Sequence, residues 1–273
     1  MEIETMLVAV DFRPPSLQAA RWAATLVGRA VRIELAHVAP ARDASDIDEA
    51  HRKLLAGLTG FASTLGAVPA QLHVRFGDPA VELCALARAR GSDLMVLGRN
   101  AEGGDDGRTR DRLLSGARVP VLVVGGPGAT PPRRIVAALD AGPAAAGVLA
   151  AATAIVDRSG GELVQLHVPA SDVEPAGELL EHLRREPADL LVIGRNASAD
   201  DPETLGRTTR LLARGAPIPV LVIPPEYASR PRPPRAGRGL HSRAVRALAL
   251  HQGTIAPRPS LDEPPPHEPL PAA

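Results

Sequence analysis

Short apolar runs alternate with amphipathic stretches along the first 125 residues of this chain. The apolar runs are typical of buried strands, and the stretches between them repeat apolar residues at helical spacing. One such helix opens at Pro14, and a longer one covers residues 46–65. The predicted strands are residues 6–10, 32–38, 71–76, 94–97 and 120–124. Strands that alternate with helices predict a parallel α/β sheet.

The same pattern restarts after a linker rich in glycine and proline at residues 125–132. The run Leu-Met-Val-Leu-Gly-Arg-Asn-Ala at residues 94–101 returns as Leu-Leu-Val-Ile-Gly-Arg-Asn-Ala at residues 190–197, and Gly-Arg-Thr follows each copy. An apolar run that ends in glycine, with a second glycine opening a helix, is how α/β proteins form an anion pocket. We therefore predict two related domains, residues 1–125 and 133–224.

The second repeat is shorter than the first. In the first repeat 39 residues separate His37 from Gly77, whereas five separate His167 from Val173 in the second. The deletion removes the long helix and the third strand. In a parallel sheet of order 3-2-1-4-5 the third strand lies at an edge, so the crevice between strands one and four is expected to survive in both domains.

Residues 225–273 differ from the rest in composition. Twelve prolines fall between Pro224 and Pro271, with arginines among them. This composition is typical of a disordered tail. A brief basic amphipathic helix over residues 242–250 is an alternative for part of it.

Charge and cysteine usage exclude several classes of protein. The formal net charge is zero, which argues against a general nucleic-acid binder. The single lysine, Lys53, removes a Walker-type phosphate site. The single cysteine, Cys84, cannot form an intrachain disulfide or a cysteine metal cluster, and we expect it to be a buried, inert thiol. Without a leader or a run of about 18 apolar residues, we expect a cytoplasmic protein outside the membrane.

The ordered elements resemble those of the universal stress protein family. The resemblance rests on Leu-Val-Ala-Val-Asp at residues 7–11, on His37-Val38 closing the second strand, and on Gly77-Asp78-Pro79 before a helix. A glycine-containing loop then precedes Pro-Val-Leu-Val-Val at residues 120–124. The resemblance covers residues 5–124 and, in shortened form, 133–223. It implies a tandem protein whose domains have five-stranded parallel sheets with helices on both faces, the second without its third strand.

Many members of this family bind ATP through a loop of the form Gly-x-x-Gly-x9-Gly-Ser/Thr. The resemblance implies that Asp11 meets the ribose or adenine, that Val38 meets the adenine, and that Gly98 and the helix start at Gly107 meet the phosphates. Asp140, Val168, Gly194 and Gly206 are the matching positions in the second repeat. The loops add Leu97, Arg99, Ala101, Arg108, Thr109, Arg207 and Thr208 to the candidate binding residues.

Both loops depart from the family form. Ala101 and Ala197 stand in place of its second glycine, and Arg108 and Arg207 in place of its final serine or threonine. Arginine offers a planar set of donors that suits phosphate. Both loops also carry acids, such as Asp105 and Asp106 in the first. These acids would repel a phosphate unless Mg²⁺ bridged them, or they would pair with the neighbouring arginines.

Two further pairs of residues leave alternatives open. Asp11 and Asp140 end the first strands, where each can contact a ligand, cap the following helix, or do both. His37 and His167 lie near strand ends. No further histidine, cysteine or acid joins them at metal-ligand spacing, so we interpret them as packed strand histidines.

The functional hypothesis is a stress-response regulator that binds an adenine nucleotide and acts through ligand-dependent binding. No nucleophile with an evident base and no paired carboxylates support an enzyme. The alternative is a nucleotide-free scaffold for protein interaction whose pockets have decayed. By resemblance, the strands at residues 119–124 and 218–223 pair across the repeats and make an intrachain pseudo-dimer. A homodimer and an unidentified protein partner stay open.

Overall fold

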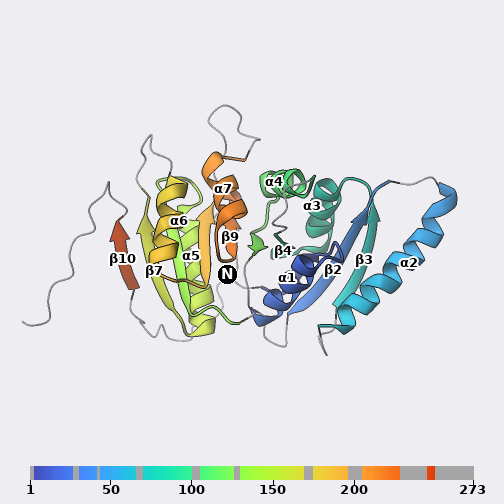
Figure 1. The fold of residues 1–273 in the computed structure, drawn as a ribbon, viewed down its shortest axis with the longest axis horizontal. Helices are drawn as coiled ribbons and strands as arrows, with labels where there is room; N and C mark the ends of the chain where they lie inside the picture. The colour runs from blue at the N-terminus through green and yellow to red at the C-terminus, as the bar shows by residue number, and fades with distance from the viewer. Residues whose placement is uncertain are drawn as a thin grey trace, which may run out of the picture.

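In a computed structural model, the chain forms one ten-stranded sheet with helices on both faces (Figure 1). The structure describes residues 3–26, 31–41, 44–65, 70–99, 105–125, 130–168, 175–195, 205–227 and 245–249. The strand order is β10-β7-β6-β8-β9-β5-β4-β1-β2-β3. The sheet is parallel within each half of the chain and antiparallel where β5 meets β9.

The first half contains the five predicted strands in the order β3-β2-β1-β4-β5. Its elements are β1 (Thr5–Ala9), α1 (Pro14–Thr25), β2 (Arg32–Ala39), α2 (Ala44–Ser63), β3 (Ala70–Phe76), α3 (Pro79–Arg90), β4 (Leu94–Gly98), α4 (Asp105–Gly116) and β5 (Val121–Val124). Proline occupies the first helical turn of α1 and α3, where its missing N–H is not needed. The alternation of apolar and amphipathic segments therefore predicts this half element by element.

The second half repeats the order without the long helix and third strand of the first. Its elements are β6 (Arg134–Leu139), α5 (Ala145–Ser159), β7 (Glu162–His167), α6 (Pro175–Arg185), β8 (Leu190–Gly194), α7 (Arg207–Gly215) and β9 (Val220–Ile223), followed by a 3₁₀ helix, η1 (Pro225–Tyr227). The carboxyl ends of β6 and β8 lie next to each other, as those of β1 and β4 do in the first half. Loss of an edge strand has left the centre of this half unchanged.

The edge left by the deletion is covered by β10 (Val245–Ala249), which pairs in parallel with β7. Figure 1 shows β10 at one end of the sheet and β3 at the other. The alternative prediction of a helix over residues 242–250 is therefore wrong, because residues 245–249 form a strand. An open β7 edge presents unpaired backbone groups, and a short segment can satisfy them as a strand. The rest of the expected disordered tail, residues 228–244 and 250–273, lies outside the described residues.

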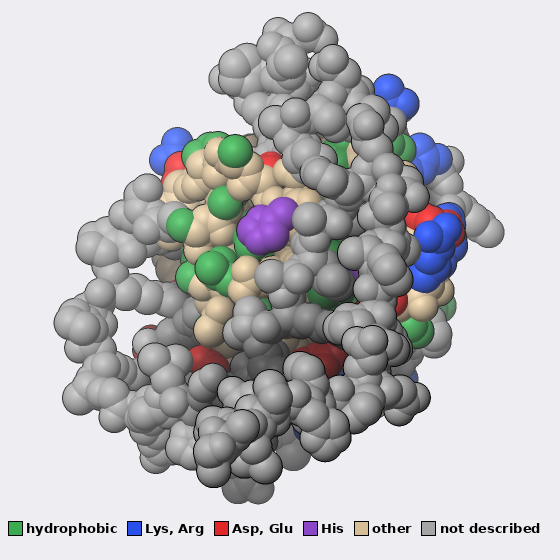
Figure 2. All heavy atoms as spheres, turned by 90° about the vertical axis from the view of Figure 1, so that its left-hand side faces the viewer, with side chains coloured by type: hydrophobic (Ala, Val, Ile, Leu, Met, Phe, Trp, Pro, Cys, Tyr) green, Lys and Arg blue, Asp and Glu red, His purple; other side chains and the backbone are tan. Residues whose placement is uncertain are grey.

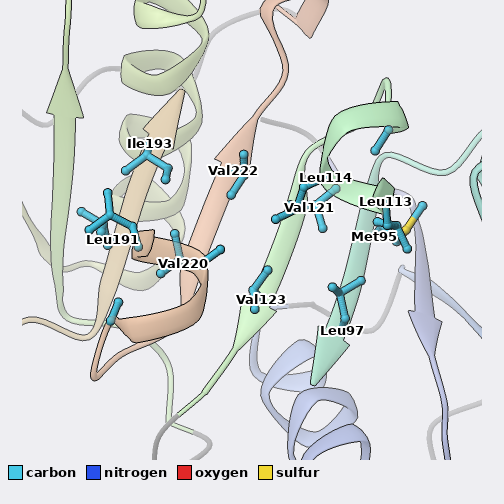
Figure 3. Close-up of a cluster of buried hydrophobic side chains, with 14 of the residues drawn as sticks. Met95, Leu97, Leu113, Leu114, Val121, Val123, Leu191, Ile193, Val220 and Val222 are labelled. Carbon is cyan, nitrogen blue, oxygen red and sulfur yellow. The ribbon is translucent and has the colours of Figure 1, made fainter. Parts of the chain in front are cut away.

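The two halves meet along β5 and β9, the two strands expected to pair across the repeats. The register is symmetric: Val121 faces Val222, Leu122 faces Leu221, and Val123 faces Val220. Figure 3 shows these valines beside side chains from β4, α4 and β8. They all belong to one buried apolar cluster that continues from one half into the other. The seam between the halves is thus part of the hydrophobic core.

Polar contacts also cross this seam in matched pairs. Arg99 Nη1 donates to the Ala216 carbonyl at the end of α7, and Arg195 Nη1 donates to Ser115 and Ala117 carbonyls at the end of α4, at 2.7 and 2.8 Å. The carbonyl end of a helix is its negative end and favours a cation. An ion pair also crosses the seam, where Arg210 Nε of α7 lies 3.3 Å from Asp111 Oδ2 of α4.

The edge strand β3 is attached by a cluster of ionisable groups. Glu34 of β2 is fully buried, with a carboxylate oxygen 3.1 Å from His73 Nε2 of β3. Arg90 of α3 donates through Nε to both Glu34 oxygens at 3.0 and 3.1 Å. The Glu34 carboxylate raises the pKa of Arg90, whereas burial lowers the pKa of His73 more than Glu34 raises it. This network joins β2, β3 and the end of α3.

Candidate functional site

The carboxyl ends of the first-half strands surround a cavity of about 220 Å³. It lies at the β1–β4 junction, where a strand order of 3-2-1-4-5 reverses direction and where open α/β sheets bind ligands. The strands contribute backbone and small apolar side chains, and α1, α3 and α4 close the sides. The described lining is Ala9, Val10, Asp11, Ser16, Ala36, His37, Val38, Pro79, Leu83, Leu97, Gly98, Thr109, Arg110 and Leu113.

Five of the candidate residues line this cavity together: Asp11, Val38, Leu97, Gly98 and Thr109. They come from three strand ends and one helix that are far apart in the sequence. Asp11 Oδ1 accepts the Arg13 N–H at 2.9 Å, which fixes the turn between β1 and α1. This bond goes to the residue before α1 and not to a helical N–H, so Asp11 is not the N-cap of that helix. Its side chain remains exposed at the mouth of the cavity.

Gly98 is required by packing. A Cβ atom on Gly98 would lie 2.4 Å from the Pro15 carbonyl carbon and oxygen and 2.7 Å from the Ser16 nitrogen. These are backbone atoms of the first turn of α1, so no side-chain movement can make room. Glycine at the end of β4 therefore lets α1 approach the sheet, apart from any contact with a ligand.

The helices around the cavity differ in how many free backbone N–H groups their N-termini can donate to an anion. Pro14 and Pro15 occupy the start of α1 and have no N–H to donate. At α3, the Asp78 carboxylate already accepts the Ala80 and Val81 N–H groups, both at 3.1 Å. These backbone bonds, together with Arg112, lower the pKa of Asp78. Of the three helices that line the cavity, α4, which follows the loop after Gly98, is the remaining one whose N-terminus can meet an anion.

Sequence reasoning did not include several residues of this cavity. His37 Nδ1 donates to the Val10 carbonyl at 2.7 Å, as a packed strand histidine, and the same ring also lines the cavity. Phe12 lies over it, with ring centroids 4.5 Å apart, and has a φ of 62°. That left-handed conformation is uncommon for a bulky residue. The Ser16 hydroxyl donates to the Arg13 carbonyl at 2.9 Å.

Other candidate residues lie away from the cavity. Arg99 does not line it, because its guanidinium crosses the seam to Ala216. Gly107 lies within the first turn of α4, and neither it nor Arg108 lines the cavity. Ala101 falls outside the described residues, as do Glu102 and the side chains of Asp105 and Asp106.

The second half has a corresponding crevice of about 30 Å³. Asp140, Val168, Gly194 and Thr208 line it, in the places of Asp11, Val38, Gly98 and Thr109. Asp140 Oδ1 accepts the Gly142 N–H at 2.9 Å, so the turn after β6 repeats the turn after β1. Gly206 is the N-cap of α7, but neither it nor Arg207 lines the crevice.

Arg195 of the second half, like Arg99, is held by the seam. Its Nη1 donates to carbonyls at the end of α4, and its Nη2 lies 3.4 Å from the Glu226 carboxylate. Burial lowers the pKa of both Arg99 and Arg195. The repeated Gly-Arg pair thus places a glycine at each crevice and an arginine across the seam.

Within the part of the chain that the structure describes, no group of three acidic, histidine or cysteine side chains could hold a metal ion. Asp11 is the one carboxylate in the described lining of the first cavity. The described residues therefore form no cluster of ligands that would hold Mg²⁺ by itself. The described helices include none long and apolar enough to cross a membrane.

Charged side chains are mixed on the face at the β10 end of the molecule. Figure 2 shows the described Lys and Arg side chains of that face in separate groups, some of them next to acidic side chains. This distribution is consistent with the zero formal net charge of the chain.

Comparisons with known proteins identify the fold and give a family match for the first half. The model of the universal stress protein family matches residues 2–125. Among solved structures, the chain is similar to a universal stress protein from Archaeoglobus fulgidus DSM 4304, at 19% identity and a TM-score of 0.66, over 81% of this chain and 96% of that one. A functionally unknown protein from Pseudomonas aeruginosa PAO1 matches at 17% identity and a TM-score of 0.58, over 83% of this chain and 95% of that one.

No curated protein matches the chain. The two structural matches extend well beyond residue 125, so the shared fold includes the second half as well. At these identities they support the fold alone. The model of the universal stress protein family matches the sequence of the first half, residues 2–125. The second half repeats the same fold in shortened form.

Proposed function

We propose that the first half binds one adenine nucleotide in the cavity between β1 and β4, and that the second half binds none. The observation that carries the proposal is the convergence of Asp11, Val38, Leu97, Gly98 and Thr109 on one cavity at the carboxyl ends of parallel strands. We assign the adenine to the apolar side near Val38, the ribose to Asp11, and the phosphates to the Gly98 loop and the start of α4.

The asymmetry between the halves rests on the sizes of the two crevices. A volume of about 220 Å³ admits part of a nucleotide, whereas about 30 Å³ is close to the volume of one water molecule. The protein is proposed to act in the cytoplasm as a stress-response regulator, through ligand-dependent binding. In the described lining of the first cavity, the Ser16 and His37 donors are both bonded to backbone carbonyls. That arrangement does not support nucleophilic catalysis.

Calorimetry of the full chain with ATP, with and without Mg²⁺, tests the proposal. We expect one ATP per chain. Asp11→Asn should weaken binding about tenfold through loss of a charge-assisted hydrogen bond to the ribose. Asparagine keeps an oxygen for the Arg13 N–H, so the turn is preserved. Asp140→Asn is the matched control in the second half and should leave the affinity unchanged.

Two results would contradict the proposal. Absence of binding up to millimolar ATP would favour the nucleotide-free interaction scaffold. An equal loss of affinity in Asp11→Asn and Asp140→Asn would show that the two halves do not differ as proposed.

A further inference from the structure

A second hollow in the first half, unrelated to the crevice, runs between α3 and α4. Its volume is about 510 Å³, and it shares no lining residue with the cavity at β1 and β4. Its floor is apolar and consists of small or narrow side chains. The floor residues are Ala80, Cys84, Ala87, Met95, Ala117 and Val119. We call this hollow the α3–α4 groove.

The rim of the α3–α4 groove is positively charged. Arg88, Arg112 and Arg118 line it with exposed side chains, and the described lining contains no carboxylate. Arg112 is paired with Asp78, which lies at the start of α3. Among the described residues, Arg88 and Arg118 form no ion pair. The groove therefore presents two unneutralised guanidinium groups next to an apolar floor.

A buried hydroxyl also lies on the groove lining. Ser92 is 1% exposed, and its Oγ has no hydrogen-bond partner in the described part of the chain. The Ser92 backbone N–H donates to the Ala87 carbonyl at 2.9 Å, so among these two groups only the hydroxyl has no partner in the described part of the chain. Most buried hydroxyls in folded proteins have a partner, and an exception calls for an explanation such as a missing ligand atom.

The equivalent place in the second half lacks these features. Leu180 stands in place of Cys84, Leu183 in place of Ala87, and Ala188 in place of Ser92. Leu183 is buried, and Leu180 packs against the same buried cluster. On the rim, Leu211 replaces Arg112 and Pro217 replaces Arg118. The small floor, the hydroxyl and the arginine rim thus occur together in the half that has the groove.

We propose that the α3–α4 groove binds an amphipathic anion, an apolar chain that ends in a carboxylate. The chain lies along the floor at Cys84 and Ala87, and the carboxylate meets the guanidinium groups of Arg88 and Arg118. Arginine donors form paired hydrogen bonds with a carboxylate. The groove volume lies within the range of about 300–1,000 Å³ that small-molecule sites have. This site is independent of the proposed nucleotide site, with which it shares no residue.

Cys84 is a built-in reporter for occupancy of the groove. It is the single cysteine of the chain and lies half-buried on the groove floor. Burial raises the pKa of its thiol, so alkylation by neutral iodoacetamide is best followed at mildly alkaline pH. Decanoate, decyl phosphate, 1-decanol and butyrate are the probes. We expect decanoate to slow alkylation at about one tenth of the concentration that 1-decanol needs, and butyrate not to slow it.

Variants test whether the protection arises in the groove. Arg88→Gln combined with Arg118→Gln should raise the required decanoate concentration at least about tenfold and leave 1-decanol unchanged. Both side chains are exposed, so this variant is expected to fold. Ala87→Leu copies Leu183 and should abolish protection by filling the floor. Arg184→Gln, at the position equivalent to Arg88, is the matched control and should have no effect.

Three outcomes would overturn the proposal. The first is absence of protection by decanoate below its micelle concentration. The second is equal protection by 1-decanol and decanoate, and the third is protection that persists in the double arginine variant. Stronger protection by decyl phosphate than by decanoate would replace the carboxylate by a phosphate as the preferred head group.

Discussion

The two crevices of this chain have matching positions and different volumes. Each is lined by the aspartate after the first strand, the valine at the end of the second, and the glycine that ends the strand paired with the first. The first has about 220 Å³ and the second about 30 Å³. The same positions therefore line both crevices, but the volume of the crevice is much smaller in the second half.

Two positions near the start of the last helix differ between the halves. Leu205 stands in the place of Asp106, is 3% exposed, and belongs to the same buried cluster as the crevice residues Ile193 and Leu212. Thr209 stands in the place of Arg110 and is also buried, with its hydroxyl 3.4 Å from the Gly194 carbonyl. These contacts attach the start of α7 to the end of β8.

This comparison shows that the sheet centre does not depend on the size of the crevice beside it. The second half has a smaller crevice and lacks a helix and a strand, yet its central strands pair in the same register as those of the first half.

The largest effect is expected from adding one methyl group at Gly98. Because a Cβ there would lie 2.4 Å from the Pro15 backbone, Gly98→Ala should reduce the free energy of unfolding by at least about 3 kcal/mol. Urea denaturation measures it. Gly60→Ala, on α2, is the control, because nothing lies within 4 Å of the added methyl; it should be neutral or stabilising. A stable Gly98→Ala protein would refute the packing role.

A somewhat smaller effect is expected from opening the second crevice. Leu205→Ala removes a buried side chain and should cost roughly 2–4 kcal/mol in the free energy of unfolding. The nucleotide stoichiometry should stay at one per chain, because a wider crevice still lacks the first-half surroundings. Calorimetry and urea denaturation of the same variant measure both quantities. A second nucleotide per chain would show that Leu205 alone blocks the second site.

The seam arginines should differ in importance despite their equivalent positions. Arg195 donates to several carbonyls at the end of α4, whereas Arg99 donates to Ala216 alone among the described residues. Arg195→Ala should therefore cost about 2 kcal/mol and Arg99→Ala about 1 kcal/mol in the free energy of unfolding. Lysine variants, which have fewer donors, should fall between. Equal losses would indicate that the two ends of the seam are equivalent.

The smallest effect is a pH dependence to which both halves contribute. Burial lowers the pKa of His73 and of His182 from the usual value of 6.5. The unfolded chain then binds more protons than the folded chain below that pH, so stability is retained above it and falls as the pH drops. Unfolding at about pH 7.5 and pH 5.5 checks this. The slope should flatten in His73→Gln and in His182→Gln, and stability that rises on acidification would contradict it.

The hydrophobic pattern predicts the strands and the location of the first cavity well. Apolar runs mark the buried strands, and the carboxyl ends of parallel strands meet, so Asp11 and Gly98 are expected at the crevice. That Val38 lies there too was an implication of the family resemblance. The partners of Arg99 and Arg195 were out of reach of this reasoning. A guanidinium suits a phosphate and a helix carbonyl equally, and the carbonyls that bind lie across the seam in the other half.

The strand β10 could not be predicted for a different reason. Residues 245–249, Val-Arg-Ala-Leu-Ala, are a short apolar run with one arginine, which fits a helix as readily as a strand. Their strand pairing depends on the open edge of β7, which arises from a deletion some 70 residues earlier in the chain. A local pattern carries no information about such a distant edge. His37 was missed as a lining residue of the cavity, and the contact of Phe12 with its ring depends on the left-handed backbone at Phe12.

The ion pair between Asp111 and Arg210 has a consequence for how these chains recognise their own halves. The two residues occupy equivalent positions in the repeats and face each other across the seam. Two identical subunits related by a twofold axis would bring Asp111 against a second Asp111, with like charges in contact. Because the two repeats of one chain differ in sequence, equivalent positions can carry an aspartate in one repeat and an arginine in the other. The ion pair therefore favours pairing of a first half with a second half over pairing of a first half with a copy of itself.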